Sequence, residues 1–267
     1  MPTFPSPQPV TVDARLPGGT FHLIAEERDT VEVEVLPDNN SDSSRQAAAE
    51  TTVDLHGDTL RIHAPELHGW LIRRAPRLRV TARVPAGSPA RIRTMSADVE
   101  VVGRIGATKL NTAGGNATLA HVDGDLAIKS ASGNLRATQI SGRLIAHSAS
   151  GDLMVDQVGG AVEIKSASGD ARIGRAGGDV TVRSASGDLW VDSARQGTVN
   201  VTTVSGDVIV GVEPGTGVWL DLNSLSGRAV NELSMTEEAA ADHRLTIAIR
   251  SVSGDITVRR AVGAPSS

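Results

Sequence analysis

Two regularly spaced sets of polar residues could bind ions or a charged partner. The first, which directly follows a repeated glycine, consists of Asn116, Asn134, Asp152, Asp170, Asp188 and Asp207. Carboxylates in a row could hold cations, but Asp and Asn are also favoured in turns, where they accept backbone hydrogen bonds. Calcium-binding β-rolls use nonapeptides with several glycines, whereas each half-repeat here usually has one. We therefore expect the turn role.

The second set is mostly basic and recurs every 18 residues: Arg93, Asn111, Lys129, His147, Lys165 and Arg183. A line of cations could contact a polyanion, an anionic surface or an acidic partner. The same charges could instead balance nearby carboxylates, including Glu163, and keep a sheet soluble. Both interpretations stay open, and Lys129, His147, Lys165 and Arg183 are the candidate contact residues.

A third set combines apolar and basic residues: Thr118, Arg136, Met154, Arg172, Trp190 and Ile209. Arg172 could stack on Trp190 through a cation–π contact. An exposed Trp is often the centre of a binding surface. We predict that Arg136, Met154, Arg172 and Trp190 contact a protein partner or a second copy of the chain. The alternative is that the N-terminal region covers them.

These sets arise from a Ser-x-Ser-Gly motif that repeats along the chain. Its glycines are Gly115, Gly133, Gly151, Gly169 and Gly187, followed at looser spacing by Gly206, Gly227 and Gly254. A short, strict period is typical of a solenoid, whose repeats bury their apolar faces by stacking. Within each repeat, apolar and polar residues alternate, which is the periodicity of β-strands. The sequence therefore predicts an all-β, single-domain β-solenoid, a right-handed β-helix of about 18-residue coils.

Five positions of the repeat hold mostly aliphatic residues and are expected to face inward. Counted from the glycine as position 1, they are positions 3, 5, 8, 12 and 14. Position 17, which is Ala131, Ala149, Ala167 and Ala185, is expected to be a tight inward corner. The last coils, which begin at Gly206, Gly227 and Gly254, are expected to stack in sequence order.

The regular period covers only part of the chain. Residues 1–90 are predicted to form starting coils or an irregular β-cap, with a β-hairpin in 51–65 and a mobile polar loop at 37–50. Residues 91–260 are predicted to be the regular solenoid, with an insertion at 235–244, and 261–267 a tail. A helix is expected to begin at Ser234, within the capping-box sequence Ser-Met-Thr-Glu.

Composition excludes several function classes. The 267 residues contain no Cys and no Tyr and carry a formal charge of -5, so a disulfide framework and a general nucleic-acid surface are not expected. The chain has no phosphate-binding loop, metalloprotease motif or nucleophile elbow. We therefore assign no catalytic residue, cofactor site or metal ligand. Without a secretory signal or a long apolar stretch, a cytoplasmic location is predicted.

The motifs themselves are similar to those of one bacterial family. The segment VPAGSP at 84–89, the SASGD repeats and the closing SVSGDITV at 251–258 resemble the putative-adhesin domain family of unknown function, from about Val10 to Arg260. The resemblance implies a β-helix and, through the family's name, adhesion. Taken with the residue sets and the missing enzyme motifs, it predicts an adhesin-like, non-catalytic scaffold that binds a protein partner, itself, or an anionic polymer or surface. The alternatives are a polymer-forming cytoskeletal β-helix and a carbohydrate-active β-helix enzyme, such as a polysaccharide lyase or hydrolase.

Overall fold

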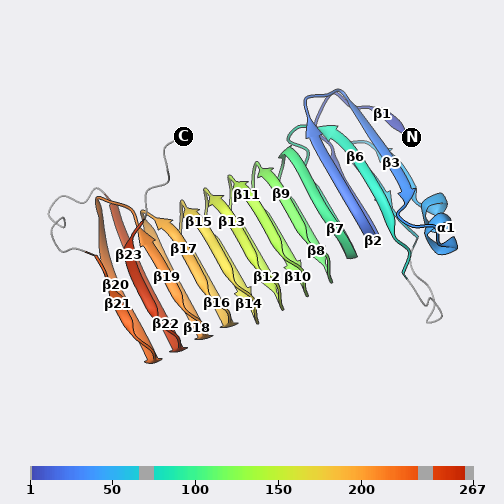
Figure 1. Cartoon of the computed structure of the whole chain (residues 1–267). Helices are drawn as coiled ribbons and strands as arrows, with labels where there is room; N and C mark the ends of the chain where they lie inside the picture. Colours follow the sequence, from blue (N-terminus) through green and yellow to red (C-terminus); the bar gives the residue numbers. More distant parts are fainter. Residues whose placement is uncertain (1, 66–74, 234–242, 262–267) are drawn as a thin grey trace. The chain divides into compact units, whose positions relative to one another are not determined.

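The computed structural model describes residues 2–65, 75–233 and 243–261 (Figure 1). The chain falls into two compact units, Met1–Arg136 and Ala137–Ser267. Both consist mainly of β-strands, most of which stack as parallel rungs of a β-helix, so the predicted fold class is confirmed. None of the described segments forms a helix that is long and apolar enough to cross a membrane.

Each regular coil of the second unit contributes two strands, one to each of two sheets. The first sheet contains β11 (Leu135–Ile140), β13 (Leu153–Val158), β15 (Ala171–Ala176), β17 (Leu189–Ala194) and β19 (Val208–Val212). The second contains β12 (Leu144–Ser148), β14 (Val162–Ser166), β16 (Val180–Ser186) and β18 (Gly197–Ser205). Leu153 lies beside Ala171, and Ala171 beside Leu189. Residues 18 apart are therefore neighbours in the stack, as the period predicts.

The core consists of the five aliphatic positions of each coil. Ile173 and Val191 on one sheet, and Val180 and Val182 on the other, are at most 2% exposed. A large aliphatic side chain contributes about 1.5–3 kcal/mol when it is fully buried, so each coil gains several kcal/mol by stacking. These positions confirm the predicted inward columns.

The alanines of position 17 do not belong to this core. Ala131, Ala149, Ala167 and Ala185 are all exposed, so the expectation of a tight inward corner is wrong. The turn itself explains the result, because the hydroxyl of Ser166 donates a hydrogen bond to the carbonyl of Ser168 over 2.8 Å. Ser148 and Ser184 make the same bond. The tripeptide loops away from the core, and its central Ala points into solvent.

The first unit begins its regular stack with β7 (Ala90–Ile105), β8 (Thr108–Thr112), β9 (Ala117–Val122) and β10 (Leu126–Ser130). The first long strand of the chain, β2 (Thr11–Glu26), pairs with β7 on one side. On its other side β2 pairs with β5 (Thr59–His63) and β6 (Leu78–Pro85). β2 is therefore the second rung of the stack, and β5 and β6 together form the rung outside it.

Antiparallel strands cover the outer rung of the first unit. β3 (Thr30–Pro37) pairs with β6, β1 (Thr3–Pro5) pairs with β3, and β4 (Thr52–His56) pairs with β5. The β4–β5 pair is the predicted hairpin, with Gly57 at its turn at a φ of 59°. An antiparallel cover of this kind removes the open end of the stack.

The polar segment between β3 and β4 is a helix where a loop is expected. α1 (Asp42–Glu50) follows the N-cap Ser41, whose side chain accepts a hydrogen bond from the backbone N–H of Ser44. Ala47 is buried, and the hydroxyl of Ser44 accepts from the backbone N–H of Arg77 over 3.0 Å. The loop prediction for 37–50 is therefore wrong over α1, because capping and alanine propensity outweigh the polar composition.

The last two coils of the second unit stack in reversed order. The outermost strands are β20 (Thr216–Ser226) and β21 (Ala229–Asn231), whereas β22 (His243–Ser253) and β23 (Ile256–Arg260) lie between them and the regular coils (Figure 1). Gly206 donates its N–H to the carbonyl of Ser253, and Gly254 donates to that of Ser226. The expectation of sequence-order stacking is therefore wrong.

Side-chain composition accounts for this exchange. β22 and β23 supply Ile247, Ile249, Ile256 and Val258, all fully buried. The outer β21 offers only the sequence AVN, and every one of its residues is exposed. The more apolar coil therefore occupies the position that is covered on both sides. The predicted insertion and helix fall mostly on residues 234–242, and the tail mostly on 262–267; these lie outside the described residues.

Candidate functional site

The acidic set links successive coils through their backbones. Oδ1 of Asp152 accepts the N–H of Asp170 over 3.0 Å, and Oδ1 of Asp170 accepts the N–H of Asp188 over 2.9 Å. The last coils, which stack in reversed order, make the same contact. Oδ1 of Asp207 accepts the N–H of Asp255, and Oδ1 of Asp255 accepts the N–H of Arg228. The described residues contain no group of three or more His, Asp or Glu that could hold a metal ion. The side chains thus accept backbone hydrogen bonds at the turns, as expected, but the donor belongs to the next coil of the stack and not to the same turn.

The basic set is partly neutralised by a carboxylate on the same sheet. His147, Lys165 and Arg183 are neighbours on β12, β14 and β16 of the second unit. Lys165 Nζ lies 2.7 Å from Oε1 of Glu163, and Nε2 of His147 lies 4.0 Å from the same oxygen. The hydrogen bond from Lys165 and its positive charge lower the pKa of Glu163. In the first unit, Lys129 on β10 lies beside Asn111 on β8.

The third set lies on the other sheet. Met154, Arg172 and Trp190 are consecutive neighbours on β13, β15 and β17, and Arg136 is on β11. Met154 is exposed and Trp190 is half-buried. The guanidinium of Arg172 is engaged with Asp192, because its Nε donates to Oδ2 over 2.9 Å. Within the second unit, the structure thus divides the predicted contact residues between two sheets: His147, Lys165 and Arg183 lie on one, and Met154, Arg172 and Trp190 lie on the other.

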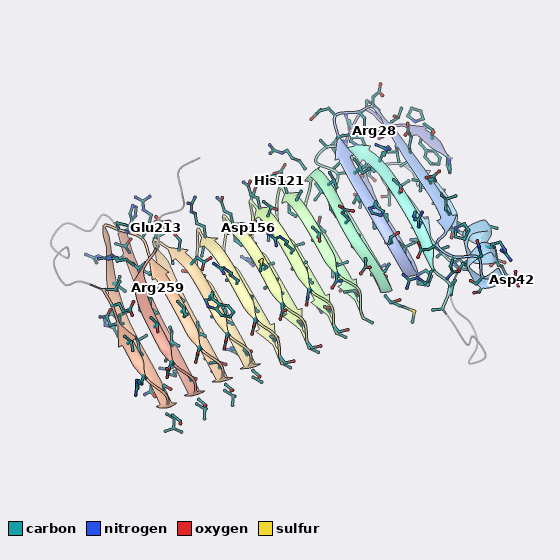
Figure 2. The ribbon with its side chains drawn as sticks, in the orientation of Figure 1. Arg28, Asp42, His121, Asp156, Glu213 and Arg259 are labelled. Atoms are coloured by element: carbon teal, nitrogen blue, oxygen red, sulfur yellow. The ribbon has the colours of Figure 1, made fainter. Side chains whose placement is uncertain are left out.

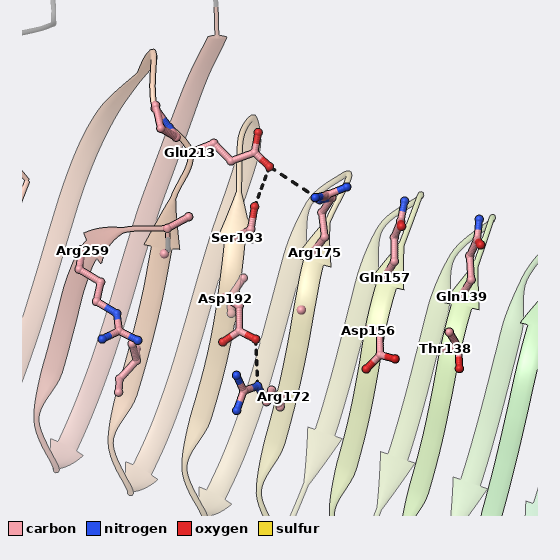
Figure 3. Close-up of a pocket in the computed structure, with 16 residues that line it drawn as sticks. Thr138, Gln139, Asp156, Gln157, Arg172, Arg175, Asp192, Ser193, Glu213 and Arg259 are labelled. Carbon is pink, nitrogen blue, oxygen red and sulfur yellow. Dashed lines mark hydrogen bonds and ion pairs between the residues drawn. The ribbon is translucent and has the colours of Figure 1, made fainter. Parts of the chain in front are cut away.

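A groove of about 870 Å³ lies on the outer face of the first sheet, within the second unit (Figure 3). Of the predicted contact residues, only Arg172 lines it. The polar and charged residues around the groove are Thr138, Gln139, Asp156, Gln157, Arg172, Arg175, Asp192, Ser193, Glu213 and Arg259. Figure 2 shows Asp156, Glu213 and Arg259 among the outer side chains of this unit.

A local break in strand alternation creates the groove. In each coil two consecutive residues point outward between buried ones, as Asp156 and Gln157 do between Val155 and Val158. Stacking turns these pairs into two parallel rows. Gly174 interrupts the first row, because it has no side chain. A larger residue does not fit here, since its Cβ would lie 2.3 Å from the carbonyl oxygen of Asp156. This missing side chain deepens the floor between Asp156 and Asp192.

The end of the groove nearest β19 is held by ion pairs and hydrogen bonds. Ser193 Oγ donates to Oε1 of Glu213 over 2.6 Å, and Nε of Arg175 lies 3.9 Å from the same oxygen. Together with the Arg172–Asp192 pair, these contacts fix the side chains before any ligand arrives (Figure 3). A preorganised polar surface loses less conformational entropy when it binds.

The opposite end presents polar groups without protein partners. The side chains of Gln139, Asp156 and Gln157 make no hydrogen bond or ion pair within the described part of the chain, and neither does that of Arg259 at the margin. Each Gln amide can both donate and accept. Three arginines and three carboxylates line the groove, so its formal charge is zero. This combination suits a neutral ligand that carries many hydroxyl or amide groups.

The sequence contains a signal for the groove that column analysis alone overlooks. Inward positions 3 and 5 are two residues apart, but positions 5 and 8 are three apart. Strict alternation would place only one residue between two inward positions. The spacing of three must therefore place two adjacent residues, at positions 6 and 7, on the outer face. The pair is polar in several coils, for example Thr138 with Gln139 and Asp156 with Gln157.

Comparison with known proteins agrees with the resemblance of the motifs. The model of the Toastrack DUF4097 family matches residues 19–263, which confirms the predicted kinship. No curated protein sequence matches the chain. A solved putative adhesin from Bacteroides fragilis is similar at 12% identity and a TM-score of 0.45, with 97% of this chain and 95% of that one covered. A putative lipid binding protein from Parabacteroides distasonis is similar at 10% identity and a TM-score of 0.45, with 98% of this chain and 96% of that one covered.

Proposed function

The chain belongs to the Toastrack DUF4097 family, and we propose that it is a non-catalytic binding scaffold of adhesin type. Its ligand lies in the groove of the second unit. One observation carries this proposal: the side chains of Gln139, Asp156 and Gln157 form a solvent-facing polar patch without partners among the described residues, beside ion pairs that hold the rest of the lining in place. The stacked coils supply the rigid support that such a patch requires.

The ligand that suits this surface is a neutral, hydroxyl-rich polymer, such as a polysaccharide chain. The groove runs across successive strands, so its polar groups repeat at the strand spacing of about 4.8 Å. A pyranose ring is about as long as this spacing, whereas a residue of an extended peptide advances only about 3.3 Å. Sugar hydroxyls both donate and accept, which matches the Gln amides.

Charge argues against an anionic polymer as the ligand. The arginines of the groove are balanced by an equal number of carboxylates. On the other sheet, a shallow depression of about 420 Å³ is lined by three basic residues, Arg143, Lys165 and Arg183, and by two acidic ones, Glu163 and Asp179. Neither surface has the large excess of one sign that concentrates a polyanion.

The geometry also favours binding over the two alternatives. Asp192 and Glu213 are occupied by hydrogen bonds and ion pairs, which leaves Asp156 as the carboxylate of the groove without a partner among described residues. Glycoside hydrolysis generally uses two carboxyl groups that flank the bond to be cleaved and that act on the substrate. A filament requires open ends, and β1, β3 and β4 cover the outer rung of the first unit.

Isothermal titration with soluble glucans, mannans and an acidic polysaccharide tests the proposal. We expect at least one neutral polymer to bind. Gln157→Ala and Asp156→Ala should each weaken binding about three- to tenfold, the typical value of one hydrogen bond. Thr181→Ala, a change on the opposite sheet, is the matched control. Failure of every neutral polymer to bind, or equal affinity of the groove variants and wild type, would contradict the proposal.

Chromatography of the polymers after long incubation tests the non-catalytic part separately. We expect no shorter fragments from any polymer that binds. Release of fragments that stops in Asp156→Asn would instead identify an enzyme, and the groove would then be an active site.

A further inference from the structure

The outermost strand of the second unit has an apolar edge. β20 pairs with β22, and the part of the chain that the structure describes contains no strand on its other side (Figure 1). The side chains of Trp219 and Leu225 on β20 are 60% and 81% exposed, and Val230 on β21 is 39% exposed. A strand with a free edge is a template on which another strand can pair.

The hydrophobic core runs open to this end. Val218, Leu220 and Leu222 lie against Leu245, Ile247 and Ile249 of β22. The three β22 residues are at most 1% exposed, whereas the three β20 residues remain only partly buried. Among the described residues of the second unit, the inner side chains of this last rung thus have no strand beyond them.

β20 also lacks the features that usually protect an edge strand. Soluble proteins place Lys, Pro or a β-bulge on such edges, or cover them. The eleven residues of β20 include no Lys and no Pro, and their pairing with β22 is regular. Asp221 is the single charged residue. The outer rung of the first unit, in contrast, is covered by antiparallel strands.

We propose that β20 pairs antiparallel with β20 of a second copy, about a two-fold axis at Leu222. In this register Trp219 lies opposite the partner's Leu225, and Asp221 lies opposite the partner's Asn223. Directly opposite residues point to the same face, so the apolar pair and the polar pair are each matched. A register centred on Asp221 would place two carboxylates together.

The same axis also joins the two open cores. A two-fold rotation about a line through both sheets reverses each strand but keeps inward residues inward. Leu222 meets the partner's Leu222, and Leu220 meets the partner's Ser224. The contact is isologous: the β20 edge of each copy is covered by the β20 edge of the other. No free β20 edge remains, and assembly stops at a dimer. This inference does not depend on the ligand of the groove.

Sedimentation of the full chain tests the association. We expect a mass about twice the 27.7 kDa of one chain, and a self-association weakened at least tenfold by Leu225→Arg. Val204→Arg is the matched control. The side chain of Val204 is also exposed, at 54%, but it lies on β18, which is paired with a strand on each side and is not an edge strand. A monomeric wild type would overturn the proposal, as would equal loss of association in both variants.

Cross-linking tests the register without relying on a disruptive charge. The chain contains no Cys, so any disulfide reports an introduced thiol. Leu222→Cys should form a covalent dimer under mild oxidation, because opposite Cα atoms lie about 4.5–5.5 Å apart. Leu220→Cys alone should not, because the two thiols would be about 13 Å apart along the strands. The double variant Leu220→Cys/Ser224→Cys should cross-link again. Cross-linking of Leu220→Cys alone, or none at Leu222→Cys, would disprove the register.

Discussion

Oδ1 of Asp170 accepts a hydrogen bond from the backbone N–H of Asp188, one coil further along the stack, over 2.9 Å. Asn116 makes the same contact through its amide oxygen, with the N–H of Asn134 over 3.0 Å. The shared feature is a side-chain oxygen at this position, whether charged or neutral. A row of carboxylates that resembles a cation site therefore joins the coils of the solenoid.

Replacing Asp170 separates the role of this oxygen from that of the charge. Asp170→Asn should change the free energy of unfolding by less than about 0.5 kcal/mol, because the acceptor is retained. Asp170→Ala should lower it by about 1–2 kcal/mol, because the N–H of Asp188 loses its partner. Guanidinium unfolding followed by circular dichroism measures both values. Equal destabilisation by the two variants would show that charge, and not the acceptor, is what matters.

Gly187 allows the close approach of two coils at the repeated turn. Its φ is 116°, and a Cβ would lie 2.2 Å from the carbonyl oxygen of Gly169. Gly187→Ala should therefore cost about 3 kcal/mol or more, since backbone strain and a clash add together. Gly215→Ala is the control in the same unit, because Gly215 has a φ of 74° but no atom within 4 Å of its Cβ position.

For Gly215→Ala we expect a loss of about 1–2 kcal/mol, from strain alone. Chemical unfolding of the two variants under identical conditions measures the difference. If both variants lose the same stability, the close contact between Gly187 and the carbonyl of Gly169 makes no contribution.

The period of the sequence was sufficient to predict the β-helix and its inward columns. Every coil places apolar residues at the same positions. A position that is ambiguous in one coil can therefore be assigned from the equivalent positions of its neighbours. Leu153, Ala171 and Leu189 are consecutive neighbours as the 18-residue spacing requires. The hairpin at β4 and β5 was also predictable, because its two strands flank a glycine turn.

The order of the last coils was not predictable from the period. Residue spacing fixes which positions share a column, but β20 and β22 both place aliphatic residues in the same inward columns. Their order depends on which coil is the more apolar, a comparison of whole strands. The groove was missed for a related reason. Asp156 and Gln157 are unremarkable singly, and only stacking on Arg175 and its neighbours makes them a surface.

The ion pair between Lys165 and Glu163 predicts a specific change in acid titration. Nζ of Lys165 lies 2.7 Å from Oε1 of Glu163, and this hydrogen bond lowers the pKa of the carboxyl group. A carboxyl whose pKa is lowered by folding stabilises the native state above its ordinary pKa. That contribution is lost as the pH falls through the lowered value. Lys165→Met should therefore raise the pKa of Glu163.

Carboxyl-carbon NMR shifts of Glu163, recorded between neutral and acidic pH, measure this change. Thr181→Ala, at the residue beside Glu163 on β16, is the control and should leave the titration unchanged. An unaltered midpoint in Lys165→Met would mean that the pair does not persist in solution.

The exchanged order of the last coils can be tested by disulfides within one chain. Thr202 on β18 lies beside Arg250 on β22, and Arg250 lies beside Asn223 on β20. Neighbouring rungs are about 4.8 Å apart, within the limit of about 7 Å between the Cα atoms of a disulfide, whereas alternate rungs are about 9.6 Å apart. Thr202→Cys/Arg250→Cys should therefore oxidise to an internal disulfide, and Thr202→Cys/Asn223→Cys should not. Mass spectrometry of the monomer identifies the bond. Stacking in sequence order predicts the opposite pair of results, because β20 would then separate β18 from β22.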